Sequence, residues 1–531
     1  MIESDLKKWN AAAESFGPSE CTGLAGPAAA VLPRRHPMTP DSAVQIAVFL
    51  LLTALVAFAT WLHCRKAVRS TDGAREYFLA NGGLNAVFIA GSITLTNIST
   101  DTFVGMNGAQ CLNIVWWELS GAVGLLLLAT LFIPIYYRYK CTTVTELLER
   151  RYGNKHIRAT VALVFLIGNV FLFLPAMLYT SALVMKNMFN LGDTLGGMDT
   201  LYVIGVAVAV IGAAYAVFGG LRAVAISDTY CGVIVLGLGL ALVFFALDAI
   251  GWSFAGVPAE RLRLMGTSTD PIPWPTLLTG MVFSQLFYWS TNQTITQRAL
   301  AAPSVAEAKR GVYLALAIRL LLVPAMTAIP GLCAYKLFGP IGDASYGRLV
   351  GATLPHWLSG AFAAAMFAAV LSSYNSVLNS SAALYVCDLH QKYINPNGNI
   401  ARLGIGISLG FALVSIGLMP LYVGATSIIA LIQQVLGLFS MPILSAFIVG
   451  LLFRNVDARA VIATVGFGAG LYGLLTFGWN WLRTLAPVLP ESVHFLHLMA
   501  LTVLACIGFA LALNRVVFGR RASMGWAAET M

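Results

Sequence analysis

The sequence feature that most constrains this chain is a series of apolar segments, each about 20 residues long, that recurs from residue 43 almost to the C-terminus. An α-helix of that length crosses a hydrocarbon core about 30 Å thick. Because lipid cannot hydrogen-bond exposed peptide groups, such segments cross a membrane as helices. The pattern predicts an all-α, polytopic membrane protein.

Thirteen segments fit this pattern. The expected spans are 43–63, 84–110, 114–137, 158–187, 200–219, 229–249, 276–298, 311–336, 355–392, 402–422, 425–452, 459–481 and 493–514. Together they form a single transmembrane domain, 43–514, followed by a short cytoplasmic tail, 515–531. The polar stretch 1–42 lacks the apolar region of a signal peptide and is expected to be disordered, with Met38 a candidate for the true start.

Composition excludes other classes of protein. The chain is 58% apolar and 10% charged, whereas soluble domains are roughly half apolar and a quarter charged. A soluble enzyme is therefore excluded. The net charge of +9 would suggest nucleic acid in a soluble protein, but cytoplasmic loops of membrane proteins collect Lys and Arg. We expect membrane lipid around the protein and no nucleic-acid partner.

The basic residues indicate the orientation. Of 32, 21 fall in connections on one side of the expected membrane, Arg158 and Arg298 among them, and ten fall on the other side. The richer side is expected to be cytoplasmic. That puts the N-terminus outside and the C-terminus inside a plasma (inner) membrane. Arg319 is left over, inside the span 311–336.

Polar residues gather in two of the spans. The second span has seven polar residues in nine over 94–102, and the seventh has a comparable cluster over 284–293. Such stretches are tolerated at membrane depth where a helix is broken and lines a cavity. Because the two spans lie five apart, they predict inverted repeats at about 84–249 and 276–452, with the binding site between them. The spans 43–63, 459–481 and 493–514 would then be peripheral.

The ninth span contains the adjacent hydroxyls Ser372 and Ser373 within a longer polar face. Two interpretations are open. Small polar residues allow helices to pack closely and to hydrogen-bond to one another. Hydroxyls beside a helix break also suit a small hard cation such as sodium, which prefers oxygen ligands.

Charged residues inside spans are functional candidates because each is costly in lipid. Asp101 lies in the polar stretch of the second span, as a cavity wall or a ligand contact. Glu118 is either interfacial, beside Trp residues, or a ligand contact. Asp228 either caps the helix that follows Gly220 or lies on a cation path. Arg319 snorkels to the interface, holds a polar ligand or pairs with a carboxylate.

The sequence contains no motif for covalent chemistry. No HExxH, Walker A or GxGxxG pattern is found, and the eight cysteines show no metal-ligand spacing. They are expected to be free core thiols. We therefore expect no enzyme activity, no cofactor and no ATP-driven transport.

Five sequence strings resemble one family. They are EYFLANGGL (76–84), TNISTDTFVG (96–105), YAVFGGLRAVAISD (215–228), YWSTNQTITQRALAAPSVAEAKRG (288–311) and LSSYNSVLNSSAAL (371–384). In this order and spacing, from about residue 43 to 455, the chain resembles the sodium/solute symporter family, and its YW, NQ and QRALAA strings are most similar to the sugar branch. The resemblance implies the broken-helix inverted-repeat fold.

The resemblance also implies an ion site. Sodium, the co-transported ion, would bind the backbone carbonyls of Leu95, Ile98 and Ala369 and the hydroxyls of Ser372 and Ser373. Asp228 would attract the ion along its inner exit path without ligating it.

The implied solute site has eight members. The sugar would be held by Asn97, Glu118, Gln285, Arg319 and Gln433, with Tyr288 stacking on it as the inner gate, Trp289 supporting that gate and Thr102 nearby. Four residues depart from the family pattern. Thr102 stands in place of Gln or His, Gln285 in place of Asn or Thr, and Arg319 in place of Lys. Gly121 stands where one member has Ser. An arginine suits a carboxylate as well as a hydroxyl.

These features predict a sodium-coupled symporter that imports a sugar or related polyol by alternating access. The alternatives are a sodium symporter for another small polar solute, such as a carboxylate, sialic acid or an amino acid, and a sensor that binds solute without moving it.

Overall fold

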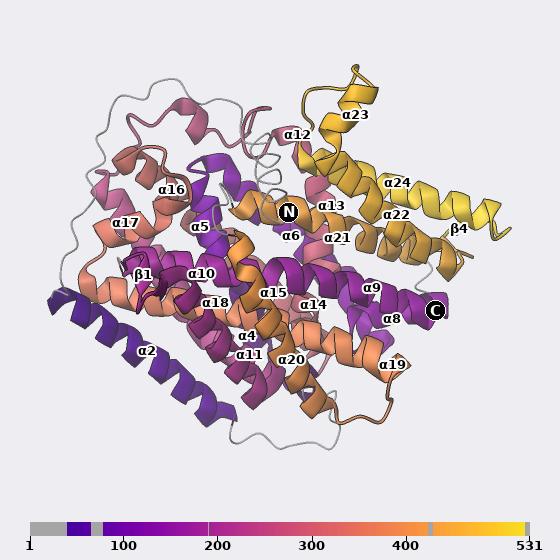
Figure 1. The fold of residues 1–531 in the computed structure, drawn as a ribbon, viewed down its shortest axis with the longest axis horizontal. Helices are drawn as coiled ribbons and strands as arrows, with labels where there is room; N and C mark the ends of the chain where they lie inside the picture. Colours follow the sequence, from indigo (N-terminus) through magenta and orange to yellow (C-terminus); the bar gives the residue numbers. More distant parts are fainter. Residues whose placement is uncertain (1–39, 65–77, 190, 423–427, 526–531) are drawn as a thin grey trace.

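The computed structural model describes residues 40–64, 78–189, 191–422 and 428–525 of the 531-residue chain (Figure 1). The described chain is mostly α-helical, with two short antiparallel strand pairs, which confirms the predicted class. The polar stretch 1–39, including Met38, lies outside the described residues. Six of the eight cysteines, at positions 111, 141, 231, 333, 387 and 506, are buried free thiols, as expected.

The helices of the first half are α2 (Pro40–Cys64), α4 (Ala86–Asn97), α5 (Thr100–Gly108), α6 (Trp116–Leu127), α7 (Ile133–Arg138), α8 (Val144–Tyr152), α9 (Lys155–Gly168), α10 (Leu174–Met188) and α11 (Thr200–Ala249). Those of the second half are α12 (Trp274–Leu277), α13 (Gly280–Leu286), α14 (Gln293–Leu300), α15 (Val305–Leu321), α16 (Val323–Phe338), α17 (Ser345–Thr353), α18 (His356–Ala383), α19 (Gln391–Tyr393), α20 (Ile400–Leu418), α21 (Ile428–Leu452), α22 (Ala458–Phe477), α23 (Trp479–Leu485) and α24 (Phe495–Val516). Strand β1 (Thr194–Leu195) pairs with β2 (Met198–Asp199), and β3 (Phe453–Arg454) pairs with β4 (Ser523–Met524).

Both predicted helix breaks are present. Between α4 and α5 the backbone leaves helical geometry at Ile98 (φ −83°, ψ 87°) and Ser99 (φ −115°, ψ 179°). In the seventh span, a π-helix over Phe287–Thr291 follows α13, and Asn292 is extended before α14 begins. The Asn292 side chain accepts a hydrogen bond from the backbone N–H of Thr294, which caps the new helix. The polar clusters in the sequence therefore mark true interruptions.

The predicted spans 200–219 and 229–249 meet in α11, which has two arms. Gly220 joins the arms with φ 53° and ψ −157°, a conformation that only glycine adopts without strain. The second arm begins directly after Gly220, so Asp228 lies about two turns inside it. The interpretation of Asp228 as a helix-capping residue is therefore wrong, because no free helix N-terminus lies beside it.

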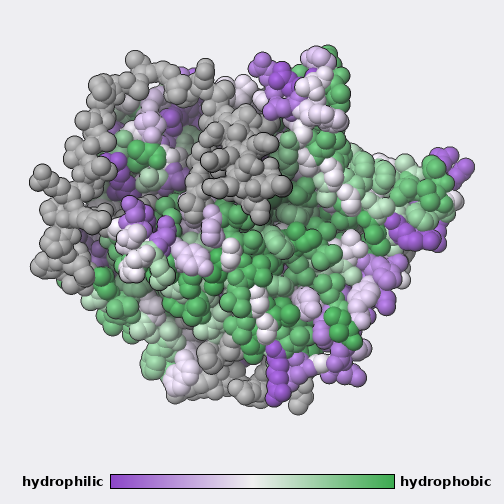
Figure 2. Space-filling model, in the orientation of Figure 1, coloured by the Kyte–Doolittle hydropathy of each residue, from purple (hydrophilic) through white to green (hydrophobic). Residues whose placement is uncertain are grey.

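Ten helical segments of the described chain are long and apolar enough to cross a membrane. The predicted spans 84–110 and 276–298 are not among the ten because their helices are interrupted, and for 200–219 only the apolar helical stretch Thr200–Ala214 is counted. The chain is a multi-pass membrane protein, and the count of thirteen crossings stays a prediction. Figure 2 shows a broad hydrophobic surface across the molecule, with hydrophilic residues gathered at the edges.

Helix α18 forms the centre of the fold. In the most apolar stretch of the span His356–Tyr393, which contains α18, 94% of the residues are buried, whereas 11% are buried in the span formed by α2. Helix α18 packs on α11, α2, α10 and α20, while α4 packs between α11 and α15. In Figure 1, α2 lies along one edge, and α22 and α24 lie on the opposite side. This arrangement places both helix breaks against the buried central helix.

Candidate functional site

All eight residues predicted to hold a solute line one cavity of about 100 Å³. They come from the break after α4, from α5, α6, α13, the π-helix 287–291, α15 and α21. The cavity residues are Asn97, Thr102, Glu118, Gln285, Tyr288, Trp289, Arg319 and Gln433. The two breaks thus contribute to one space, as the repeat hypothesis expects.

Arg319 and Glu118 form a buried ion pair in the wall of this cavity. Arg319 Nη2 lies 3.0 Å from Glu118 Oε2, and the two residues are 6% and 2% exposed. The guanidinium also donates to the side-chain oxygen of Asn97 and stacks on the Trp289 ring at 4.2 Å. Arg319 is too deep to snorkel and Glu118 is not interfacial, so both of those interpretations are wrong.

Two amides of the cavity are held differently. Gln285 donates to Trp117 O (2.9 Å) and Ser120 Oγ (3.0 Å), and its oxygen accepts from the Trp289 indole N–H (2.9 Å). The Gln433 side-chain oxygen has no hydrogen-bond partner among the described residues. A buried amide oxygen without a partner costs free energy unless a ligand or water supplies a donor.

Two hydroxyl groups hydrogen-bond with Asn97 at the break after α4. Tyr288 OH accepts a hydrogen bond from Asn97 Nδ2 (3.2 Å), and Thr102 Oγ1 donates to the backbone oxygen of Asn97 (2.9 Å). Thr102 therefore stabilises the break itself. The side chain of Asp101 lies outside the described part of the structure.

Sequence reasoning missed other polar residues that line the same cavity. Asn169 lies in a π-helix after α9 and donates to Ser381 Oγ (2.9 Å), and Ser284 lies in α13. Ser284 belongs to the predicted polar cluster 284–293 but was not assigned to the solute site, whereas Asn169 is a lone amide in an apolar span and could have been found on that ground.

Part of the predicted sodium site comes together beside the first helix break, where Ser373 meets the end of α4. Ser373 Oγ lies 3.1 Å from the backbone oxygen of Thr96 and 3.4 Å from that of Leu95. Ile98 and Ala369 are buried in the same cluster as Leu95. Thr96 was not predicted as a member of this site. The structure thus brings α4 and α18 together through backbone carbonyls and a hydroxyl.

Ser372 faces a second, smaller cavity of about 30 Å³, which Asp228 and Asn375 also line. Its hydroxyl makes no hydrogen bond of good geometry with a described residue. Asp228 Oδ2 accepts from Ser92 Oγ at 2.5 Å, while Oδ1 has no such partner in the described chain. Ser372 and Ser373 therefore point to different sides of α18.

Arg298 is a buried charge that sequence reasoning assigned wrongly to a cytoplasmic connection. It is 0% exposed in α14, and its Nε donates to Ser92 Oγ at 2.9 Å. Its position at the end of a predicted span made it resemble a loop residue. Only its tertiary partners show that it lies inside the protein.

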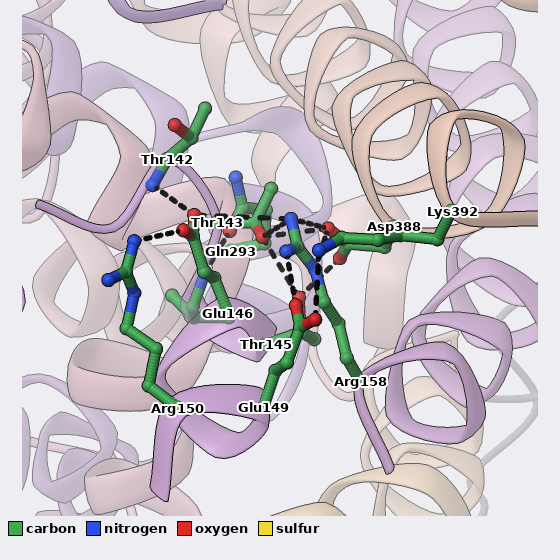
Figure 3. A network of polar contacts seen from close by, with 11 residues as sticks. Thr142, Thr143, Thr145, Glu146, Glu149, Arg150, Arg158, Gln293, Asp388 and Lys392 are labelled. Carbon is green, nitrogen blue, oxygen red and sulfur yellow. Dashed lines mark hydrogen bonds and ion pairs between the residues drawn. The ribbon is translucent and has the colours of Figure 1, made fainter. Parts of the chain in front are cut away.

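A second buried ionic network lies where α8 and α9 meet the π-helix Leu384–His390, which continues α18 (Figure 3). Asp388 accepts hydrogen bonds from Arg158 Nε (2.7 Å), Thr143 Oγ1 (2.8 Å) and Thr145 Oγ1. Arg158 is 4% exposed and lies in α9, so it is a buried charge within a helix and not a residue of an exposed loop. Sequence reasoning did not single out Asp388.

Glu149 connects this network to Lys392. Its two carboxylate oxygens accept from Arg158 Nη1 (2.6 Å) and Lys392 Nζ (2.8 Å). Burial opposes ionisation of Glu149, but the hydrogen bonds from the two cations outweigh it and lower the pKa of this carboxyl.

Comparison with known proteins gives consistent results. The family model described as "Sodium:solute symporter family" matches residues 77–468. An uncharacterized symporter, YidK, of Escherichia coli (strain K12) is 34% identical over 88% of this chain and 84% of its own. The sodium/glucose cotransporter of Vibrio parahaemolyticus is 28% identical (80% and 83%), and the sodium/myo-inositol cotransporter 2 of Mus musculus is 27% identical (88% and 75%).

Solved structures confirm the fold. The structure of a Na+-coupled sialic acid symporter in a substrate-bound, outward-open state superposes with a TM-score of 0.73. It covers 89% of this chain and 98% of its own at 16% identity. At that identity the likeness bears on the fold alone.

Proposed function

The chain belongs to the sodium:solute symporter family, and from this premise we propose that its solute is a neutral polyhydroxyl compound, a sugar or related polyol. Sodium-coupled symport follows from the family and its cotransporter relatives, and the protein is a transporter and not an enzyme. The open questions that the proposal addresses are the solute and the residues that bind it.

The observation that carries the proposal is the neutralisation of Arg319. Among the described residues that line the solute cavity, the charged ones are Glu118 and Arg319, and they pair with each other. An anionic solute would have to displace Glu118 from a desolvated ion pair, which is costly. A neutral solute can instead exchange hydrogen bonds with the amides and hydroxyls around the pair.

The rest of the cavity supports a polyhydroxyl ligand. Asn97, Gln433 and Ser284 offer amide and hydroxyl groups, and Tyr288 presents an aromatic ring beside them. Hydroxyls of a sugar match such donors and acceptors, while its C–H face suits an aromatic surface. The printed names of the glucose and myo-inositol cotransporters point to the same class of solute.

The proposed ion site couples sodium to the solute through the break after α4. Leu95 and Thr96 present carbonyls to Ser373, and the next residue, Asn97, faces the solute cavity. An ion that orders the carbonyls on one side of the break would therefore order Asn97 on the other. Each sodium that moves down 100 mV supplies about 2.3 kcal/mol, or roughly fiftyfold in solute concentration.

Proteoliposomes with an imposed sodium gradient test the proposal. Uptake of labelled glucose, galactose and myo-inositol is compared with that of sialic acid, pyruvate and proline, and potassium replaces sodium in the control. We expect sodium-dependent uptake of a neutral polyol. Sodium-dependent uptake confined to the acidic or amino-acid solutes would contradict the proposed solute, and solute binding without any uptake would favour a sensor.

A further inference from the structure

Arg298 is held inside the protein by groups that carry no charge. Its three guanidinium nitrogens donate to Ser92 Oγ, to the backbone oxygen of Thr294 and to Ser376 Oγ. Within the described side chains no carboxylate lies within the 4.0 Å of an ion pair with it. The positive charge is therefore solvated by hydroxyls and a carbonyl and is not cancelled by direct contact.

One hydroxyl separates Arg298 from Asp228 on the proposed ion path, and another separates it from Thr96 beside the proposed ion site. Ser92 accepts from Arg298 and donates to Asp228 Oδ2 at 2.5 Å. Ser376 accepts from Arg298, and its oxygen lies 3.2 Å from Thr96 Oγ1. The backbone oxygen of Thr96 is the one that Ser373 contacts. Arg298 thus connects α14 to α4, α11 and α18 beside the sodium ligands.

The fixed positive charge of Arg298 acts on a mobile sodium ion at the proposed site. In a poorly solvated interior, charges interact over several ångströms more strongly than in water. The guanidinium repels a sodium ion at the carbonyls and hydroxyls next to it. Through Ser92 it also competes with the ion for Asp228.

We propose that Arg298 is a positioning residue that limits how tightly sodium is held, so that the ion is released in each transport cycle. The proposal rests on the proposed sodium site. It predicts that the affinity for sodium rises when the charge is removed and is retained when the charge is kept. If Arg298 served only to pack α14, its substitution would lower activity, and the sodium affinity would not depend on whether the new residue is charged.

The test measures the half-saturating sodium concentration in two ways on purified, reconstituted protein. One is the sodium dependence of solute uptake, and the other is the sodium-dependent rise in Tm without solute, with choline keeping the ionic strength constant. The variants are Arg298→Gln and Arg298→Lys. The matched control is Arg310→Gln, whose side chain is 76% exposed on α15.

We expect Arg298→Gln to lower the half-saturating sodium concentration by about fivefold or more, because the repulsion is gone. Maximal uptake should fall because the ion leaves slowly. Arg298→Lys and Arg310→Gln should stay close to the wild-type sodium affinity. An unchanged or weaker sodium affinity in Arg298→Gln overturns the proposal.

Ser92→Ala provides a second test if Arg298→Gln does not fold. It removes the hydroxyl that joins Arg298 to Asp228 and leaves both charges in place, so the carboxylate becomes more available to sodium. We expect a lower half-saturating sodium concentration, and no change contradicts the proposal. A wild-type protein that shows neither sodium-dependent uptake nor sodium-dependent stabilisation would instead remove the proposed sodium site.

Discussion

Arg319 and Glu118 pair across 3.0 Å inside the membrane domain, one from α15 and the other from α6. Arg319 Nε also donates to the backbone oxygen of Glu118 at 3.0 Å. The pair therefore fixes two helices of different proposed repeats against each other in the wall of the solute cavity. Its charge balance is what favours a neutral solute.

Glu118→Gln should destabilise the protein by about 3 kcal/mol, because Arg319 would lose its buried counter-charge. Neutral solute uptake should fall sharply as the guanidinium changes partners. Thermal unfolding in detergent and solute uptake measure the two effects. In the double variant Glu118→Leu with Arg319→Met, stability should recover while uptake does not; recovery of uptake would show that the pair is structural alone.

Gly121→Ala should impair uptake by displacing the same guanidinium. A Cβ at Gly121 would lie 2.5 Å from Arg319 Nε and 2.9 Å from the Trp289 indole nitrogen. We expect the solute concentration for half-maximal uptake to rise about tenfold. Gly237→Ala is the matched control, since a Cβ there meets nothing within 4 Å. Equal uptake by the two variants would argue against the position of Arg319.

Tyr288→Phe should weaken solute uptake modestly. The hydroxyl makes a 3.2 Å hydrogen bond with Asn97, and such a bond contributes about 1 kcal/mol. That corresponds to roughly fivefold in apparent affinity. Tyr288→Ala, which also removes the ring beside the cavity, should have a much larger effect. If the two variants behave alike, the ring does not contact the solute.

Ser373→Ala should raise the sodium concentration for half-maximal uptake by about tenfold, because one proposed ligand hydroxyl is lost. Solute affinity at saturating sodium should change little. Ser408→Ala, in α20, removes a similarly buried hydroxyl that lines neither cavity and serves as the control. An unchanged sodium dependence in Ser373→Ala would remove this residue from the ion site.

The stability of the protein should depend on pH through His494, which precedes α24. Burial lowers the pKa of this histidine from 6.5 to about 4. Between those values the unfolded chain binds a proton that the folded protein does not, so stability should fall as the pH drops from 6.5 toward 4. His494→Gln should flatten that part of a Tm against pH curve. A curve identical to that of the wild type would exclude His494 as the cause.

The sequence predicts the parts of this molecule that follow from local composition. Polar clusters mark the interruptions at Ile98–Ser99 and at Asn292, because broken backbone at membrane depth needs polar surroundings. The solute cavity was predicted through resemblance to a family, and its residues do converge on one space. Their roles in binding remain predictions for the experiments above.

Other features depend on contacts between distant segments. Arg158 and Arg298 lie at the ends of expected spans, where hydropathy cannot separate a loop charge from a buried one. Their partners, Asp388 and Ser92, are 230 and 206 residues away in the chain. Such pairings arise only when the helices pack.

The ionic network around Asp388 restricts where the transporter can bend. It joins the beginning of α9 to the π-helix Leu384–His390 after α18 and, through Thr143 and Thr145, to α8 (Figure 3). Separating these helices would expose unpaired charges to an apolar interior at a cost of several kcal/mol. These helix ends therefore move as one rigid unit, and the conformational changes of a transport cycle take place at other contacts between helices.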